Sequence, residues 1–328
     1  MTPRIPLTAC IGLAMAATLG MTDAHAADTV NLGNLRFAHY GAVSYMKEVC
    51  PKYGITVSEH VFAKGPDIMP AIVAGDIDLA ALASDGAIGG RANGVPIYVV
   101  AGFAQGGARL VVGNGTAIRS VGDLKGKKVG VTRGGAQELL LYAELDKHKL
   151  SWSSTGDKGK DVEVVFLPFA DLNQALAGGH IDAMMQSEPQ SSQAIRRQIG
   201  RELLKPYDTA LGQPKRLLVM SERLYRNRDL ALRLTKCFVE STATFIQNPA
   251  LAEQYVREKM FKGDLSAEEF RDAIWNAPYT YDVTMAHIDV ATDLMRKFGV
   301  GKVSPALKAA DWTRLDLLVQ AKRELKIN

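Results

Sequence analysis

Residues 71–78 read AIVAGDID and residues 175–182 read ALAGGHID, and this repeat decides the fold. Each copy predicts the end of a helix, a glycine turn and the start of a short strand. The two copies lie about one hundred residues apart, which is the size of one small domain. The repeat therefore predicts two similar lobes rather than a long array of units.

The sequence around the repeat alternates short β-rich runs with amphipathic helical stretches from Val30 onward. This alternation is typical of mostly parallel sheets covered by helices. Beyond Ser221, apolar residues recur at near-helical spacing, which predicts an almost wholly helical tail. We expect strands at residues 30–37, 55–62, 79–83, 97–103, 110–112, 128–132, 162–167, 183–186 and 217–220.

Residues 1–26 have the layout of a secretory signal peptide, with Arg4 before an apolar stretch and Ala24-His25-Ala26 as a cleavage site. The apolar stretch is too short to span a bilayer. We therefore expect a soluble mature chain that begins at Ala27 and is exported to the periplasm. The stretch Leu7-Thr8-Ala9-Cys10 looks like a lipobox, but it precedes the apolar stretch, so the sequence does not predict a lipoprotein.

Charge and cysteine content narrow the class of protein further. The 39 basic and 35 acidic residues leave a formal charge of +4, which is too small and too evenly spread to predict nucleic-acid binding. Cys50 and Cys237 remain after the expected cleavage. Export permits a disulfide between them, but both lie in apolar, helix-like segments, so we favour two buried free thiols.

The order of motifs resembles the periplasmic substrate-binding proteins of ABC transporters in the nitrate, sulfonate and taurine branch, which includes thiamine-pyrimidine relatives. The matching stretches are residues 74–80 (AGDIDLA), 123–131 (DLKGKKVGV), 179–183 (GHIDA), Glu188-Pro189 and the helical tail. This resemblance implies an α/β protein with the type II periplasmic-binding-protein fold, in which two lobes close about a two-strand hinge. Lobe one would comprise residues 27–112 and 213–328, and lobe two residues 113–212, with the hinge strands near Val112 and Pro214.

The same resemblance implies a function. We expect a monomeric solute-binding protein, not an enzyme, that captures a small organic anion and delivers it to an ABC permease. The ligand could also carry an amine or a heterocycle. Two alternatives stay open: a thiamine-pyrimidine-type biosynthetic enzyme on the same fold, which would have no reason to carry residues 1–26, and a sensory binding protein.

Ligands of open α/β sheets lie outside the carboxyl ends of the strands, where loops converge and helices begin. The strongest candidate is Arg133-Gly134-Gly135-Ala136-Gln137, because a helix start after two glycines suits an anion. Acidic side chains at such loops would instead accept hydrogen bonds from a ligand amine or ring N–H. The full set of expected ligand-binding residues is His39, Tyr40, Gly41, Lys64, Ser84, Asp85, Phe103, Gln105, Arg133, Gly134, Gly135, Ala136, Gln137, Ser187 and Glu188.

Catalytic and metal-binding signatures are missing from the sequence. It contains no Gly-x-Ser-x-Gly elbow, no His-Glu-x-x-His pair, no phosphate loop and no dinucleotide fingerprint. The histidines lack the local pairing that a metal site needs. We therefore expect no catalytic residues, no metal and no cofactor. Asp78 and Asp182 of the repeat are expected to hydrogen-bond the turn before each strand rather than a ligand.

Overall fold

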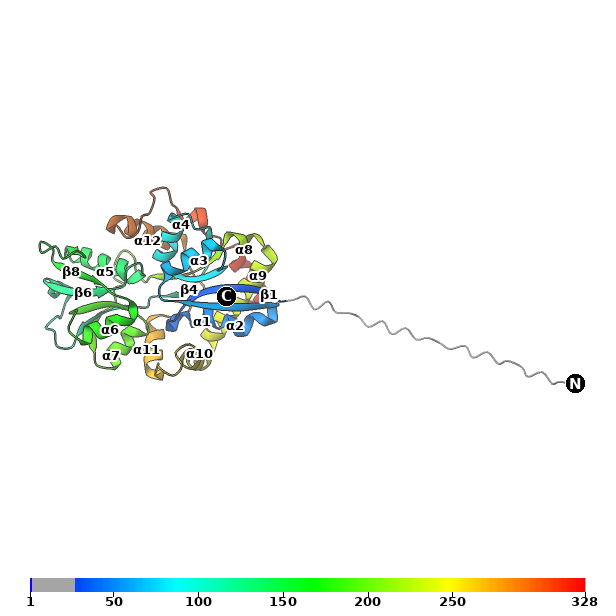
Figure 1. Cartoon of the computed structure of the whole chain (residues 1–328), viewed down its shortest axis with the longest axis horizontal. Coiled ribbons are helices and arrows are strands. Elements are labelled where there is room, and N and C mark those ends of the chain that lie inside the picture. The colour runs from blue at the N-terminus through cyan, green and yellow to red at the C-terminus, as the bar shows by residue number, and fades with distance from the viewer. Residues whose placement is uncertain (2–26, 328) are drawn as a thin grey trace.

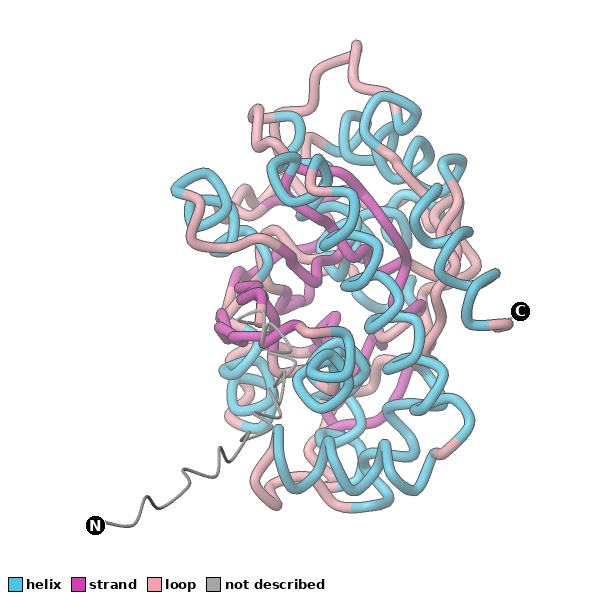
Figure 2. Tube along the Cα trace, turned by 90° about the vertical axis from the view of Figure 1, so that its right-hand side faces the viewer, coloured by secondary structure: helices cyan, strands magenta, loops and turns pink. Residues whose placement is uncertain are grey.

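A computed structural model describes residue 1 and residues 27–327 of the chain. The expected signal peptide and the stretch Leu7–Cys10 therefore lie outside the described residues. Two β-sheets, one in each lobe, form the centre of the molecule, and helices cover them (Figures 1 and 2). The expected fold class, two α/β lobes, is confirmed.

The first sheet has the strand order β2-β1-β3-β11-β4. Its strands are β1 (Asp28–Leu35), β2 (Ile55–Phe62), β3 (Leu79–Ala83), β4 (Ile97–Gln105) and β11 (Lys215–Ser221). The second sheet has the order β10-β5-β9-β6-β8-β7. Its strands are β5 (Ala108–Gly113), β6 (Lys127–Val131), β7 (Trp152–Ser153), β8 (Val162–Phe166), β9 (Ala183–Ser187) and β10 (Gly200–Leu204). The sequence pattern missed β7 and β10.

The repeat occupies equivalent places in the two sheets. Strand β1 runs parallel to β2 and β3, and β6 runs parallel to β8 and β9. The Asp78 carboxylate accepts a hydrogen bond from the backbone N–H of Asn31 at 3.1 Å. The Asp182 carboxylate accepts one from the backbone N–H of Lys128 at 2.8 Å. Both aspartates are therefore structural, as expected, but they tie β3 and β9 to the neighbouring parallel strand rather than to the preceding turn.

The helices alternate with the strands and then form the tail, which confirms the expected change after Ser221. Lobe one carries α1 (Gly41–Ser44), α2 (Met46–Val49), α3 (Met69–Ala74), α4 (Ser84–Ala92) and the tail helices; lobe two carries α5 (Ala136–Lys147), α6 (Phe169–Ala177) and α7 (Gln190–Arg196). The tail comprises α8 (Glu222–Arg226), α9 (Arg228–Gln247), α10 (Pro249–Tyr255), α11 (Ala267–Asn276), α12 (Met285–Phe298), α13 (Ala309–Trp312) and α14 (Asp316–Leu325). Within residues 27–327, no helix is both long and apolar enough to cross a bilayer.

Two crossings join the lobes. The first is Gly106-Gly107, between β4 and β5, and the second is the segment between β10 and β11. They are hydrogen-bonded to each other, because the Gly106 N–H donates to the Pro214 oxygen at 2.9 Å. Gly106 has a φ of +71°, and a Cβ there would lie 2.3 Å from the Asn276 oxygen, so only glycine fits. Because β5 belongs to the second sheet, the first crossing lies before Ala108 rather than near Val112.

A disulfide links Cys50 to Cys237 across lobe one. It joins the segment after α2 to the long helix α9, with the two Cα atoms 5.1 Å apart. The expectation of two free thiols was wrong. Both residues are indeed buried in apolar surroundings, but the tertiary fold packs them side by side despite a separation of 187 residues in the sequence.

Candidate functional site

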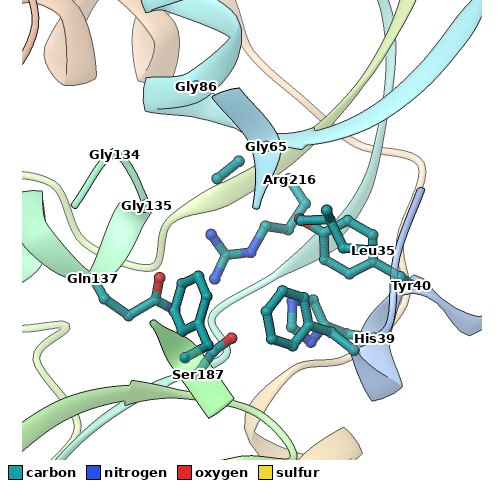
Figure 3. A pocket seen from close by; sticks show the side chains of 13 residues that line it. Leu35, His39, Tyr40, Gly65, Gly86, Gly134, Gly135, Gln137, Ser187 and Arg216 are labelled. Atoms are coloured by element: carbon teal, nitrogen blue, oxygen red, sulfur yellow. The ribbon is translucent and has the colours of Figure 1, made fainter. Parts of the chain in front are cut away.

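A small cavity lies between the lobes, where the carboxyl ends of β1, β3, β6 and β9 meet (Figure 3). Both lobes supply its walls, as the strand-end rule for α/β sheets predicts. Lobe one contributes Leu35, Phe37, His39, Tyr40, Gly65, Ala83, Gly86 and Arg216, and lobe two contributes Gly134, Gly135, Gln137, Phe169 and Ser187.

The lobes touch at the rim of this cavity, so the structure is a closed form. Phe37 of lobe one packs edge-on against Phe169 of lobe two, with the ring centroids 5.2 Å apart. A Cβ on Gly134, whose φ is +74°, would lie 3.0 Å from the Pro66 ring of the other lobe. The volume of the cavity that the centre of a water molecule can occupy is only about 20 Å³. This is little more than one water needs. A larger guest can enter only if the lobes separate.

Arg216 is the central cation of the cavity (Figure 3). It lies on β11, opposite Ala83 of β3, and it is buried, with 2% of its surface exposed. One terminal nitrogen donates to the Gly106 oxygen at 3.0 Å, whereas Nε has no partner. A buried guanidinium with a free N–H is a strong donor for an anionic oxygen.

Sequence reasoning missed Arg216 because it sought site residues only in loops after parallel strands. Strand β11 is antiparallel to its neighbours β3 and β4, so the start of β11 lies at the same sheet edge as the ends of β3 and β4. The sequence signal that could have revealed the residue is a charged pair, Lys215-Arg216, at the first positions of an otherwise apolar strand directly after the second crossing.

Four of the expected residues place buried polar groups beside Arg216. His39 has no hydrogen-bond partner on either ring nitrogen, and Ser84 has none on its hydroxyl. Asp85 lies in the first turn of α4, where the backbone N–H groups of Asp85 and Gly86 partly offset the rise in the pKa of its carboxyl that burial causes. Burial, together with the charge of Arg216, lowers the pKa of His39 well below its usual value, so its imidazole is neutral at pH 7. Tyr40 lines the cavity and packs edge-on against Phe103, which is fully buried behind it.

The Gly134-Gly135 turn forms part of the lobe-two wall, and one of its backbone donors is occupied within the protein. The Gly134 N–H donates to the Glu138 carboxylate at 2.8 Å, so an internal anion already occupies that donor. Gln137 points into the cavity, and its amide donates to the Gly107 oxygen at 3.3 Å (Figure 3). Ala136 is buried as the first residue of α5. The Ser187 hydroxyl belongs to the same lobe-two wall and lies 3.4 Å from the same Gly107 oxygen.

Arg133 and Lys64 do not line this cavity. Both line a neighbouring hollow with a volume of about 290 Å³. The Arg133 guanidinium lies over the Phe166 ring, 3.9 Å from its centroid.

Glu188, Gln105 and Gly41 do not line the cavity. Glu188 is fully buried in lobe two and accepts hydrogen bonds from Arg109 at 2.7 Å and from Asn276 at 2.8 Å. Gln105 ends β4 and accepts a hydrogen bond from the Lys215 ammonium. Gly41 is the first residue of α1. A Cβ at this position would lie 2.5 Å from the Val256 side chain and 3.1 Å from the Phe245 ring.

Two α/β lobes with a cavity between them define the periplasmic-binding-protein fold, and comparisons with known proteins agree. The chain belongs to the NMT1-like family, whose model matches residues 5–257. The alkanesulfonate-binding protein of Xanthomonas axonopodis pv. citri, solved with bound MOPS, superposes with a TM-score of 0.71 at 16% identity, covering 88% of this chain and 98% of that one. The nitrate-binding protein of Synechocystis PCC 6803 superposes with a TM-score of 0.70 at 16% identity, covering 92% and 89%.

Curated relatives match shorter stretches. A protein of Brucella abortus (strain 2308) named as a binding protein is 32% identical over 146 residues, which is 43% of this chain and 41% of the relative. A protein of Bacillus subtilis (strain 168) named as an aliphatic sulfonates-binding protein is 26% identical over 197 residues, which is 59% and 57%. The matches thus span between about two fifths and three fifths of these relatives.

Proposed function

We propose that this protein is an extracytoplasmic solute-binding protein that captures a small organic anion between its lobes and presents it to an ABC permease. The family membership and the two-lobed fold support solute binding. Relatives named for sulfonate binding, and a structural neighbour named for nitrate binding, support an anion as the ligand class. The layout of residues 1–26 supports export to the periplasm.

One observation carries the choice of an anion: Arg216 lies buried in the interlobe cavity with an unpaired N–H. A buried cation without an ion pair is unfavourable unless a ligand supplies the counter-charge. The neutral His39 and the Ser84 hydroxyl add unpaired groups that can donate to ligand oxygens. Gln137 and Ser187 would then contact the ligand from lobe two, so that binding and closure are coupled.

Replacing Arg216 tests this proposal. Arg216→Gln removes the charge and should weaken anion binding by roughly 10- to 150-fold, since a hydrogen bond to a charged group contributes about 1.5–3 kcal/mol. Calorimetric titration with ethanesulfonate, propionate and nitrate measures the affinity, and thermal shifts report binding independently.

Arg226→Gln is the matched control, because Arg226 lies on the surface of α8 with 78% of its side chain exposed. Its affinities should equal those of the unchanged protein. If Arg216→Gln binds these anions as tightly as the control does, Arg216 is not the anion-binding group. If the unchanged protein binds none of them, the proposed ligand class is wrong.

A further inference from the structure

One helix from each lobe packs against the other across the boundary between the lobes. Helix α11 of lobe one lies beside α7 of lobe two, as Figure 1 shows. Glu269, Asp272 and Asn276 recur at helical spacing on α11, and all three contact lobe two. Phe270 and Ala273 of the same helix pack in an apolar cluster of lobe one. Helix α11 is therefore held to lobe one by apolar contacts and to lobe two by polar ones.

The last residue of α11 lies at the crossings between the lobes. The Asn276 oxygen accepts a hydrogen bond from the Gly107 N–H of the first crossing at 3.0 Å. Its side-chain amide donates to the Glu188 carboxylate at 2.8 Å. Glu188 is fully buried and also accepts a hydrogen bond from the Ser192 hydroxyl in the first turn of α7. The start of α7 and the end of α11 thus meet beside the hinge, where a rotation of the lobes displaces atoms least.

The other ends of the two helices meet at a second contact. Arg197, directly after α7, donates from Nε to the Glu269 carboxylate at 2.8 Å and from Nη2 to the Asp264 backbone oxygen at 3.3 Å. Glu269 precedes Asn276 by seven residues (269 to 276), which is about 10 Å along a helix. A rotation about the hinge therefore separates Arg197 from Glu269 further than it separates Glu188 from Asn276.

The Glu269 carboxylate is fixed by its own helix before it meets Arg197. One of its oxygens accepts a hydrogen bond from the Ser266 N–H at 2.9 Å, and the Ser266 hydroxyl accepts one from the Glu269 N–H at 3.1 Å. These reciprocal bonds cap the start of α11. Glu269 is also buried. A fixed, buried acceptor loses little entropy and is weakly screened, so this pair should contribute more than an exposed pair does.

We propose that Arg197 and Glu269 form a latch that holds the lobes closed and thereby sets the affinity for ligands from outside the cavity. Neither residue lines the cavity. Because the latch forms in the closed structure and separates on opening, it raises the closed fraction of the protein without ligand. The apparent affinity of a ligand that requires the closed form is proportional to that fraction. The effect on affinity rests on the proposed function, whereas the effect on closure does not.

The closed fraction can be measured with a cysteine pair across the other side of the cleft. Lys297 and Asp146 are exposed and pair across the lobes at 2.6 Å in the closed form, so both are replaced by cysteine. Cys50 and Cys237 are joined in a disulfide, so a short bis-maleimide reacts with the added thiols of the mature chain. Because lobe motions are faster than this reaction, the cross-linking rate without ligand is proportional to the closed fraction.

Arg197→Gln removes the latch and leaves the helix cap at Glu269 in place. If the lobes are mostly open without ligand, this change should slow cross-linking about two- to fivefold. Arg196→Gln is the matched control, because Arg196 is the neighbouring arginine of α7 and lies 3.7 Å from Glu268, with both side chains exposed. The control should cross-link at the rate of the protein that carries only the cysteine pair.

Affinity provides the second measurement, made without the added cysteines. Titration calorimetry with ethanesulfonate, propionate and nitrate should show that Arg197→Gln weakens the binding of every probe by one common factor. That factor should equal the decrease in the cross-linking rate. Both effects should become smaller at high salt, because the Arg197 side chain is half exposed and its charge is screened.

An unchanged cross-linking rate in Arg197→Gln, or an equal decrease in Arg196→Gln, would overturn the latch while leaving the proposed function intact. A loss of affinity for one probe but not for the others would contradict an action through closure. If no probe binds to the unchanged protein, it is the proposed function that fails, and the cross-linking rates still decide whether the latch exists.

Discussion

At the scale of single residues, the site combines side chains that sequence reasoning found with one that it missed. His39, Tyr40, Gln137 and Ser187 line the cavity, and their loops follow strands as the α/β rule requires. The sequence did not predict Arg216 as a site residue, because its strand, β11, is antiparallel to β3. Glu188 follows a strand end too, but its carboxylate faces Arg109 inside lobe two.

Asp85 should make the stability of the protein depend on pH. Because its pKa is raised from 3.8 to about 6, the folded state keeps a proton that the unfolded chain has lost. The free energy of unfolding should therefore fall by about 3 kcal/mol as the pH rises from about 4 to about 6, and the deficit should persist above pH 6.

Asp85→Asn cannot ionise and should lack this deficit. Urea unfolding of both proteins without ligand, at a series of pH values, measures the difference between them. We expect a difference that grows between about pH 4 and about pH 6 and then stays constant. A difference that does not change with pH would show that Asp85 titrates normally.

At the scale of elements, the repeat places β3 and β9 in equivalent positions, and local pattern was enough to locate both. The apolar runs 55–62 and 79–83 coincide with β2 and β3. The two-residue strand β7 and the partly buried β10 carry too weak an alternation to be seen. Short edge strands of this kind depend on the neighbour with which they pair rather than on their own residues.

The disulfide joins two elements of lobe one and should stabilise that lobe. Replacing Cys50 and Cys237 together by serine should lower the free energy of unfolding by about 2–4 kcal/mol, since the cross-link limits the unfolded chain over a long loop. Chemical unfolding under oxidising conditions measures this loss. Adding a thiol reductant to the unchanged protein is the parallel test, and a stability equal in all samples would contradict a structural role for the bond.

At the scale of the whole molecule, the tail of lobe one flanks the closed cleft on both sides. Helix α11 contacts lobe two through Glu269, which pairs with Arg197 at 2.8 Å. Helix α12 contacts it through Lys297, which pairs with Asp146 at 2.6 Å, and through Phe298, which packs edge-on against Trp152. The pair of Lys297 with Asp146 is exposed and can break and re-form at low cost when the lobes move. Helix α11 also makes buried contacts with lobe two, because Asn276 donates to Glu188 at 2.8 Å and Asp272 pairs with Arg109 at 2.9 Å.

Opening and closing should therefore be visible in solution. Without ligand, the lobes should populate an open form, because the closed cavity holds little more than one water and leaves Arg216 Nε without a hydrogen-bond partner. A saturating anionic probe should shift the population to the closed form. Small-angle X-ray scattering should then show a smaller radius of gyration, whereas identical scattering with and without a bound probe would exclude hinge closure.

The sequence by itself determined the two-lobed α/β architecture, because the helix, turn and strand signals of each repeat copy are written in neighbouring residues. It also determined which strand-end loops approach the cleft. Only the tertiary structure decided that Cys50 meets Cys237, that Glu188 pairs with Arg109 and that Arg216 enters the cavity. Those contacts join residues 79 or more positions apart, and the packing of whole elements, not local periodicity, brings such residues together.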